Sequence, residues 1–407
     1  MHTFAPADIL LPNVDSMEKW AVIACDQFVS QPEYWASVRS FVGNAPSTLK
    51  LVLPEADLPH STDADIANIN AAMADYLNQG IFKCYEKSYI YVERTLLNGT
   101  IRRGVVGAVD LEDYDYTPDS DALIRATEKT VVERIPPRVK IRKDAPIELP
   151  HVLLLCDDDQ QILLDSIDTT TLPCLYDFDL MEGGGRIRGW LMQGKDAEAF
   201  SQKLDTYAAA QNAKYPNKPV LFAVGDGNHS LASAKSCYEA LKQENPGVDF
   251  SNHPARYALV ELENIHDASQ VFEPIHRIIT NTDPQLLLQA LEAACGAEMG
   301  CDVKWFIGEK TGTVRLKLKE GQLCVGAVQA FLDDYLKNHP GETDYIHGDD
   351  TVAQLAKADN AIGFLLPVME KGQFFAGIMA DGVLPRKTFS MGHAQEKRYY
   401  LEARKIQ

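Results

Sequence analysis

Residues 219–241 read PVLFAVGDGNHSLASAKSCYEAL and decide how the middle of this chain folds. The apolar run 219–224 is typical of an interior strand, and the apolar positions from Leu231 to Leu241 recur at helical spacing. A compact polar turn with two glycines separates the two patterns. The sequence therefore predicts a strand, a tight turn and a helix over 219–242, with the helix running from Leu231 to Lys242.

The turn would lie at a helix N-terminus, where backbone N–H groups and the helix dipole favour an anion. Asp226 and His229 would lie beside that anion as candidate catalytic residues, and Gly227, Asn228 and Ser230 are candidate phosphate-binding residues. Glycine in such a turn also lets another molecule approach the backbone closely. The alternative is a capped loop in which Asp226 or Ser230 satisfies its own backbone.

The remaining pattern is typical of a mixed α/β (α+β) fold, in which mixed sheets are flanked by helices. Segments 88–97 and 100–109 are joined by Asn98-Gly99, which predicts a β-hairpin. We expect an N-terminal α/β region at 1–130, a central region with the polar turn at 131–282, and a C-terminal α+β region at 283–407. The alternative is that these three regions pack together as one unit.

Composition limits the partners of the chain. A formal net charge of -19 over 407 residues argues against nucleic acid or an anionic membrane as a partner. No basic leader followed by an apolar run and no apolar stretch of about 18 residues occurs, so we expect a soluble, cytoplasmic protein. Eight scattered cysteines without a CxxC pair indicate reduced core cysteines.

Residues 134–143 form a basic stretch in this acidic chain: they include five basic residues and no acid. We expect Pro136-Pro137 to stiffen the stretch into an extended form, so that Arg138, Lys140 and Arg142 alternate onto one side. Such a row could clamp a phosphate or carboxylate at the cleft of the polar turn. The alternative is a solvated edge strand whose charges block aggregation.

Other polar residues give weaker signals. Asp26 follows the predicted strand 20–25 just as Asp226 follows its own strand. It is therefore a second candidate site residue, with a less specific signal, because a polar residue at a strand end is usually a turn former. Asp157-Asp158-Asp159 lacks the spacing of a calcium loop and indicates a solvated hairpin tip. A zinc site would collect His229, His266 and His276, although no local spacing typical of metal ligands supports it.

The residues Asp226-Gly227-Asn228-His229-Ser230 resemble the hallmark Asp-Gly-His-His-Arg of the bacterial and archaeal domain-of-unknown-function family 1015. Stretches 265–267, 274–277 and 384–388 add to the resemblance, which covers most of the chain. Asn228 and Ser230 replace a histidine and an arginine of the hallmark, so a role that rests on that arginine does not carry over.

The hallmark is also similar to a motif of the sulfiredoxin, ParB and free-serine-kinase group, in which the turn binds nucleotide phosphates. This resemblance implies a phosphoryl-transfer enzyme, kinase-like or phosphatase-like, that uses Mg²⁺ with ATP or ADP and acts on a small anionic metabolite, with serine or phosphoserine as the most concrete guess. Further candidate phosphate-binding residues are Arg134, Arg138, Arg277, Arg386 and Lys387. A non-catalytic metabolite sensor and a metal-dependent hydrolase are the alternatives.

Overall fold

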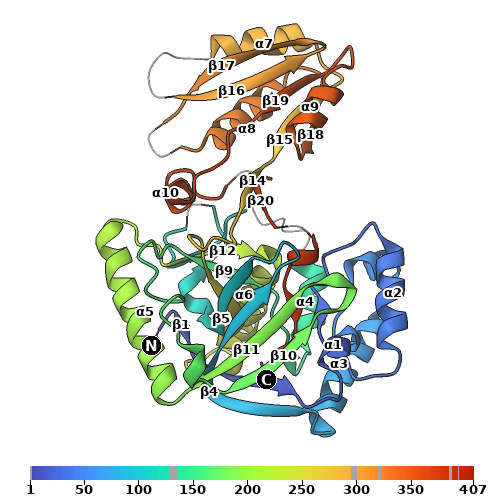
Figure 1. The fold of residues 1–407 in the computed structure, drawn as a ribbon, viewed down its shortest axis with the longest axis vertical. Helices are drawn as coiled ribbons and strands as arrows, with labels where there is room; N and C mark the ends of the chain where they lie inside the picture. The colour runs from blue at the N-terminus through green and yellow to red at the C-terminus, as the bar shows by residue number, and fades with distance from the viewer. Residues whose placement is uncertain are drawn as a thin grey trace. The chain divides into compact units, whose positions relative to one another are not determined.

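The structure is a computed structural model that describes residues 2–118, 120–128, 135–294, 300–319, 322–384, 387–392 and 394–407. The chain forms two compact units (Figure 1). Unit 1 comprises Met1–Ala126, Thr130–Gln270 and Gly392–Gln407, and unit 2 comprises Thr127–Lys129 and Val271–Met391. This division differs from the three consecutive regions expected from the sequence, because the C-terminal tail returns to unit 1 and pairs there with its beginning.

Unit 1 is built on a large mixed sheet, which confirms the predicted fold class. Along the sheet the strands are β10 (Cys174–Asp179), β11 (Arg186–Gln193), β4 (Phe82–Thr95), β5 (Ile101–Asp110), β13 (Tyr257–Asn264), β9 (Leu153–Cys156), β12 (Phe222–Asp226), β7 (Ile124–Arg125) and β6 (Tyr114–Asp115). At its margin β1 (Phe4–Ala5) pairs with β5 and β2 (Ala7–Pro12) with β4. The predicted hairpin is β4 and β5, with Thr95 opposite Ile101.

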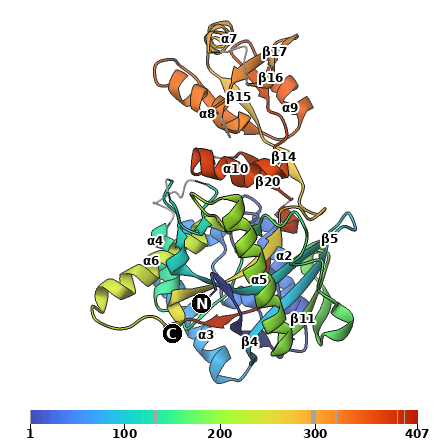
Figure 2. The same cartoon turned by 90° about the vertical axis from the view of Figure 1, so that its left-hand side faces the viewer.

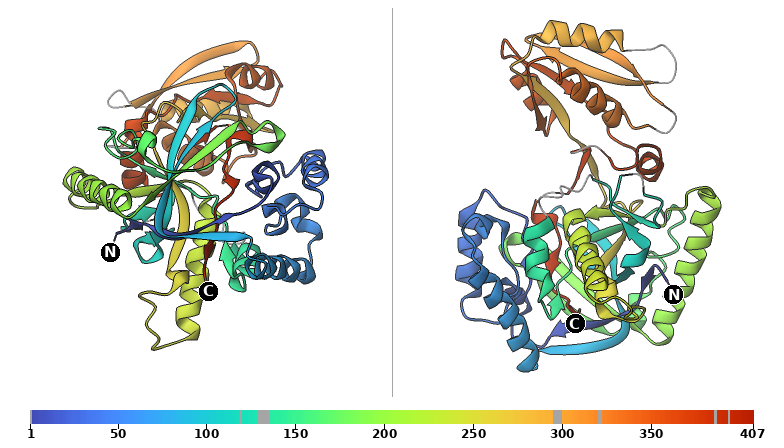
Figure 3. Two further views of the ribbon diagram at one scale, coloured as in Figure 1. Left: turned by 60° about the horizontal axis from the view of Figure 1, so that its bottom comes forward. Right: turned by 180° about the vertical axis from the view of Figure 1, so that it is seen from behind.

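Helices cover both faces of this sheet, as Figures 2 and 3 show. Alternate residues of β4 enter different cores: Ile90 lies in one hydrophobic cluster and Tyr89 in the other. The first cluster packs under the N-terminal helices and the second under the last two helices of the unit. The helices of unit 1 are α1 (Met17–Trp20), α2 (Pro32–Val42), α3 (Asp63–Asn78), α4 (Ile135–Lys143), α5 (Lys195–Lys214) and α6 (Asn228–Glu244).

The strand–turn–helix element predicted over 219–242 is β12 followed by α6. β12 lies between β9 and β7, so it is an interior strand as expected. The helix begins at Asn228 rather than at Leu231. His229 and Ser230 therefore belong to the first turn of α6, not to a loop that precedes it.

The basic stretch 134–143 is helical where it is described, and the predicted extended form is wrong. Its two prolines lie at the start of α4, and proline is tolerated in the first turn of a helix because the N–H groups there have no intrahelical partner. Arg138, Lys140 and Arg142 consequently do not alternate across a strand.

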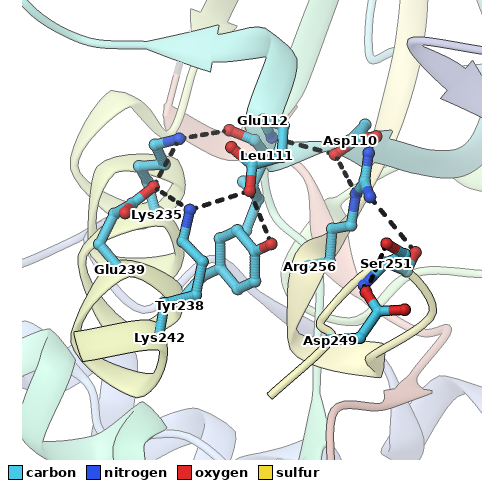
Figure 4. A network of polar contacts seen from close by, with 10 residues as sticks. All are labelled: Asp110, Leu111, Glu112, Lys235, Tyr238, Glu239, Lys242, Asp249, Ser251 and Arg256. Atoms are coloured by element: carbon cyan, nitrogen blue, oxygen red, sulfur yellow. Dashed lines mark hydrogen bonds and ion pairs between the residues drawn. The ribbon is translucent and has the colours of Figure 1, made fainter. Parts of the chain in front are cut away.

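Figure 4 shows how α6 is fixed beside the end of β5. Lys235 Nζ donates to the Leu111 carbonyl at 2.8 Å, and Tyr238 OH donates to Glu112 Oε1 at 2.7 Å. Lys242 Nζ lies 2.9 Å from the same Glu112 oxygen. These contacts come from three successive turns of the helix, so they hold its axis and thereby the position of its first turn.

Short strand pairs join the tail to the rest of unit 1. β21 (Tyr399–Tyr400) runs antiparallel to β3 (Val22–Ile23), and β22 (Arg404–Lys405) runs antiparallel to β8 (Ile147–Glu148). Arg404 also forms an ion pair with the buried Glu148 at 2.7 Å. The last residues of the chain are therefore part of the core of unit 1.

Unit 2 contains a sheet in the order β17 (Lys310–Lys317), β16 (Gly300–Ile307), β19 (Ile362–Leu365), β15 (His276–Thr280) and β18 (Glu342–Ile346), and the pair β14 (Phe272–Pro274) and β20 (Phe389–Met391). Its helices are α7 (Pro284–Ala293), α8 (Cys324–Tyr335), α9 (Asp349–Leu355) and α10 (Lys371–Asp381). Cys301 and Cys324 form a disulfide, so the expectation of reduced cysteines is wrong for this pair. None of the described helices is long and apolar enough to cross a membrane.

Candidate functional site

The turn between β12 and α6 is shaped by Asp226 and Gly227. Asp226 ends the strand, and its Oδ1 accepts a hydrogen bond from the Gly227 N–H at 2.9 Å. Gly227 has φ = 81°, in the left-handed region that favours glycine. A Cβ at this position would lie 3.0 Å from Val152 Cα and 3.3 Å from His151 Cδ2. Glycine therefore lets the turn pack directly against the chain that leads into β9.

This close approach joins Ser230 to a buried histidine. Ser230 Oγ lies 2.8 Å from His151 Nε2, and Tyr400 OH lies 2.9 Å from His151 Nδ1. Tyr400 OH in turn donates to Cys25 Sγ at 3.1 Å. His151 and Tyr400 are 8% and 3% exposed, so the middle of this chain of contacts is shielded from water, while Cys25 and Ser230 at its two ends are half-buried.

Two carboxylates and a lysine lie next to this histidine. Lys397 Nζ forms an ion pair with Asp226 Oδ2 at 3.1 Å. Burial would raise the pKa of Asp26, yet its pKa lies below the ordinary value, because the charge of His151 when that ring is protonated, the hydrogen bond from Gln27 and the charges of Arg138 and Lys397 together outweigh burial. Asp26 is thus held as a carboxylate, and the sequence prediction that it repeats the position of Asp226 agrees with its place here.

His151 has a lowered pKa because burial disfavours its charged form. Asp26 and Asp226 oppose this effect but do not overcome it. The imidazole is therefore neutral near pH 7, with carboxylates close enough to stabilise a positive charge when one forms. A buried thiol faces the same group: burial and the charge of Asp26 raise the pKa of Cys25 to about 11, so the sulfur is a thiol at neutral pH.

A cavity of about 150 Å³ adjoins the site. Most of its lining is aliphatic, and its polar lining residues are Cys25, Arg138, Arg142, Glu148, His151, Ser230, Ser233 and Tyr400. The arrangement offers an apolar space with a hydroxyl, a neutral base and a cation at one side of it. Such a space with a few convergent polar groups is typical of a small-molecule site.

The predicted clamp residues in α4 have acidic partners from elsewhere in unit 1. Arg138 pairs with Glu55, Lys140 with Asp63, Arg142 with Glu148 at 2.6 Å and Lys143 with Glu244 at 3.7 Å. Arg138 and Arg142 line the same cavity as Ser230, whereas Lys140 is exposed. Two arginines of the stretch therefore lie at the cavity that Ser230 also lines, and both carry an ion pair. Arg134 lies outside the described residues.

Asn228 and His229 are the other polar residues of the turn. Asn228 is 7% exposed, and His229 is half-buried with its carbonyl accepting from Ser233 Oγ at 2.7 Å. Both residues lie in the first turn of α6, directly after its N-cap residue Gly227.

The remaining predicted cations belong to unit 2. Arg277 is fully buried there, and its guanidinium donates to Gln329 Oε1 at 2.8 Å and to the Ile275 carbonyl at 2.7 Å. Burial lowers the pKa of Arg277 to about 10. Lys387 is exposed, and Arg386 lies outside the described residues. The contacts of Arg277 are those of a structural residue inside its own unit.

Two of the three histidines proposed for zinc have different carboxylate partners. His266 Nε2 lies 2.8 Å from Asp157 Oδ1 in unit 1, and His276 Nε2 lies 2.9 Å from Asp349 Oδ1 in unit 2. Within the described residues, no group of three or more His, Cys, Asp and Glu side chains could hold a metal ion. The geometry thus gives no support to a zinc hydrolase.

Sequence reasoning missed His151, Tyr400 and Lys397. His151 precedes a buried apolar strand, where a histidine carries no local signal of function. Tyr400 and Lys397 reach the site because β21 pairs with β3, and 375 residues separate Tyr400 from Cys25. No spacing rule within one segment could have joined them.

Comparisons with known proteins agree with the family resemblance. The model of a family described as "Protein of unknown function (DUF1015)" matches residues 7–405. No curated protein matches the chain. Similar solved structures include a conserved hypothetical protein from Pyrococcus furiosus, with 12% identity and a TM-score of 0.35, over 72% of this chain and 93% of that chain.

Two further structures are of a free serine kinase, one in complex with AMP and one, a mutant, in complex with ADP. The AMP complex is 11% identical and the ADP complex 12%, each with a TM-score of 0.34 over 74% of this chain and 91% of that chain. TM-scores this low do not carry a functional inference.

Proposed function

The chain belongs to the DUF1015 family, and we propose that its unit 1 is a phosphoryl-transfer enzyme that binds a nucleotide or phosphorylated metabolite at the turn between β12 and α6. The observation that carries the proposal is that Lys397 pairs with Asp226 and acts electrostatically on Asp26 at the first turn of α6, where Ser230 lines a cavity. Phosphoryl transfer needs mainly positioning and charge stabilisation, and these residue types supply both.

In this proposal Asp226 is the base that accepts the proton of the attacking hydroxyl. Its Oδ1 is oriented by the Gly227 N–H, and its Oδ2 faces Lys397. Lys397 would neutralise the charge of a phosphate oxygen that binds next to Asp226. Ser230, His229 and the backbone of the first turn of α6 would lie along the phosphate, where the helix dipole adds positive potential.

The two carboxylates also fit Mg²⁺ in the form in which nucleotide enzymes use it. Mg²⁺ is usually held by one or two carboxylates together with substrate phosphates, and Asp26 and Asp226 would supply those carboxylates. Bound there, the ion would neutralise charge on the transferring group. A closed set of protein ligands is not required, so the lack of a larger acidic or histidine cluster among the described residues is compatible with this use.

Arg138 supplies the second cation. Its partner Glu55 is about as buried as Arg138 itself, with 20% and 17% of the side chains exposed. An incoming phosphate would compete with Glu55 for the guanidinium, which binds phosphate oxygens in pairs. Without ligand, Glu55 would balance the charge of Arg138, and with ligand the phosphate would take over that role.

The test is a thermal-shift screen of the full chain against ATP, ADP, serine and phosphoserine with Mg²⁺. Each pair of one nucleotide and one serine compound that stabilises the chain is then tested for turnover. A ligand at 100 times its dissociation constant adds about 2.7 kcal/mol to stability. Stabilisation with conversion of the bound pair supports the enzyme. Stabilisation without conversion identifies a metabolite sensor, and no response to any of the four ligands contradicts the proposal.

A further inference from the structure

The polar chain from Cys25 to Ser230 defines one tautomer of His151. Tyr400 OH directs its proton at Cys25 Sγ, 3.1 Å away, so the Tyr400 oxygen faces His151 Nδ1 as an acceptor at 2.9 Å. The Cys25 N–H also points at this oxygen, at 3.3 Å, which strengthens its role as an acceptor. With the Tyr400 proton directed at Cys25 Sγ, the matching tautomer of His151 carries its proton on Nδ1 and presents the Nε2 lone pair to Ser230 Oγ at 2.8 Å.

This is the arrangement of an activated hydroxyl: a nucleophile within hydrogen-bond reach of a base, and the base oriented by a third group. Burial keeps the imidazole neutral and able to accept a proton. Asp26 and Asp226 act electrostatically on the same ring and would stabilise the imidazolium that results. Ser230 also lines the cavity, so its oxygen is accessible to a bound molecule.

We propose that Ser230 is a covalent nucleophile, with His151 as its base and Tyr400 as the residue that positions His151. Applied to the proposed function, on which the native step rests, Ser230 Oγ attacks the phosphorus of a phosphate ester. The Oγ–P bond forms, the bond from phosphorus to the leaving oxygen breaks, and the serine proton passes through His151 Nε2 to that oxygen. Phosphoserine 230 then transfers its phosphoryl group to an acceptor hydroxyl or to water.

The geometry gives Ser230 this role and its neighbours on α6 none. Ser233 Oγ is occupied with the His229 carbonyl at 2.7 Å, as is usual for a helical serine. Ser236 Oγ lies 3.4 Å from Tyr116 OH and does not line the cavity. Ser236→Ala is therefore a matched control on the same helix.

The test uses diisopropyl fluorophosphate, which phosphorylates activated serines with loss of fluoride and does not depend on the native substrate. The full chain is incubated with the probe, and the labelled residue is mapped by peptide mass spectrometry. We expect one label, on Ser230, with no label there in Ser230→Ala and an unchanged labelling rate in Ser236→Ala. His151→Asn should slow labelling by about 10²–10⁴-fold, because it removes the base while its amide can still face Tyr400.

Tyr400→Phe tests positioning. Without the phenol oxygen, Nδ1 loses its acceptor and the tautomer is no longer fixed, so the labelling rate should fall and its pH midpoint should shift. A structural role of Tyr400 would change the melting temperature without moving that midpoint. Circular dichroism of each variant shows whether it is folded. If His151→Asn is misfolded, the pH profile of labelling of the wild-type protein tests the role of His151 as the base instead.

The outcomes separate this proposal from the proposed function. A folded wild-type protein that is not labelled on Ser230, or a label rate unaffected by His151→Asn, overturns the nucleophile even when nucleotides stabilise the protein. Labelling of Ser230 without any response to nucleotide or serine supports the nucleophile and contradicts the phosphoryl-transfer function.

Discussion

A histidine takes part in a polar cluster at each end of strand β9 (Leu153–Cys156), and the two clusters differ in their surroundings. Before the strand, His151 contacts Ser230 and Tyr400 next to a cavity. After the strand, Asp157 Oδ1 lies 2.8 Å from His266 Nε2, while Oδ2 lies 2.7 Å from Lys214 Nζ and 3.2 Å from Tyr215 OH.

The second group is saturated from within the protein. Asp157 is 3% exposed, and its N–H and carbonyl groups face Tyr207 OH and Gln211 Nε2. Asp157 thus ties the end of β9 to the last turns of α5 and to the loop after β13. The first group instead keeps a hydroxyl and a cation at a cavity wall. Similar residue types therefore form a saturated structural cluster after the strand and the candidate site before it, and of these two only the candidate site borders the cavity that Ser230 lines.

Asp226→Asn should give the largest effect. The change keeps an oxygen for the Gly227 N–H but removes the charge that faces Lys397. We expect phosphoryl transfer to fall by about 10²–10⁴-fold, the usual range for loss of a general base. Turnover should be measured for the nucleotide and acceptor that stabilise the wild-type chain.

The melting temperature of Asp226→Asn without ligand should change little, because exposed or half-exposed ion pairs contribute about 0–1 kcal/mol. A variant that loses about 1 kcal/mol of stability but responds to ligand as the wild type does would make this end of β9 structural too. The difference between the two ends would then disappear.

Asp157→Ala is the converse experiment. It leaves Lys214, Tyr215 and His266 without the carboxylate that they share, so unfolding in urea should need about 1–3 kcal/mol less free energy. The stabilisation that a ligand adds should be unchanged. Loss of the ligand response in a folded Asp157→Ala protein would place this group in the site.

Local pattern was enough to predict the parts of the site that one segment supplies. β12, the turn and α6 follow from an apolar run, two glycines and a helical stripe, and Asp26 was found because it repeats the position of Asp226 after a strand. The mixed α/β class and the β4–β5 hairpin follow from the same kind of signal.

Long-range pairing explains what the sequence could not show. Tyr400 meets Cys25 only through the β3–β21 pair, and the tail that carries it was expected in a separate C-terminal region. The Asp157 turn was expected to be a solvated tip, but partners from α5 and from the loop after β13 bury it. The prolines of 134–143 permit either an extended form or a helix start, and packing of α4 against α6 selected the helix.

Glu55→Gln should sharpen the comparison with a smaller effect. It removes the charge of Glu55 that pairs with Arg138 at the cavity, so a phosphorylated ligand should bind up to about tenfold more tightly, which corresponds to about 1.4 kcal/mol. Isothermal titration with ADP measures this change. Asp63→Asn is the matched control, because it frees Lys140 on the same helix at an exposed position and should leave affinity unaltered. Weaker binding in Glu55→Gln would show that Glu55 itself supports the ligand.

The smallest effect is a pH dependence of stability that His151 should produce. Burial lowers its pKa, so below the ordinary histidine pKa of about 6.5 the unfolded chain binds a proton that the native chain does not. The native protein then loses stability as pH falls from about 6.5 toward the lower folded pKa.

The groups that face the ring are Asp26, Asp226, Arg138 and Arg398, and Asp26 stays charged across this window because its own pKa is lowered. Comparing urea unfolding of wild type and His151→Asn isolates the histidine from every other titrating group, and the difference in unfolding free energy, wild type minus variant, should decrease as pH falls. If that difference instead grows at low pH, the native fold stabilises the protonated ring. His151 could not then present a lone pair to Ser230, and the two ends of β9 would both be ion pairs.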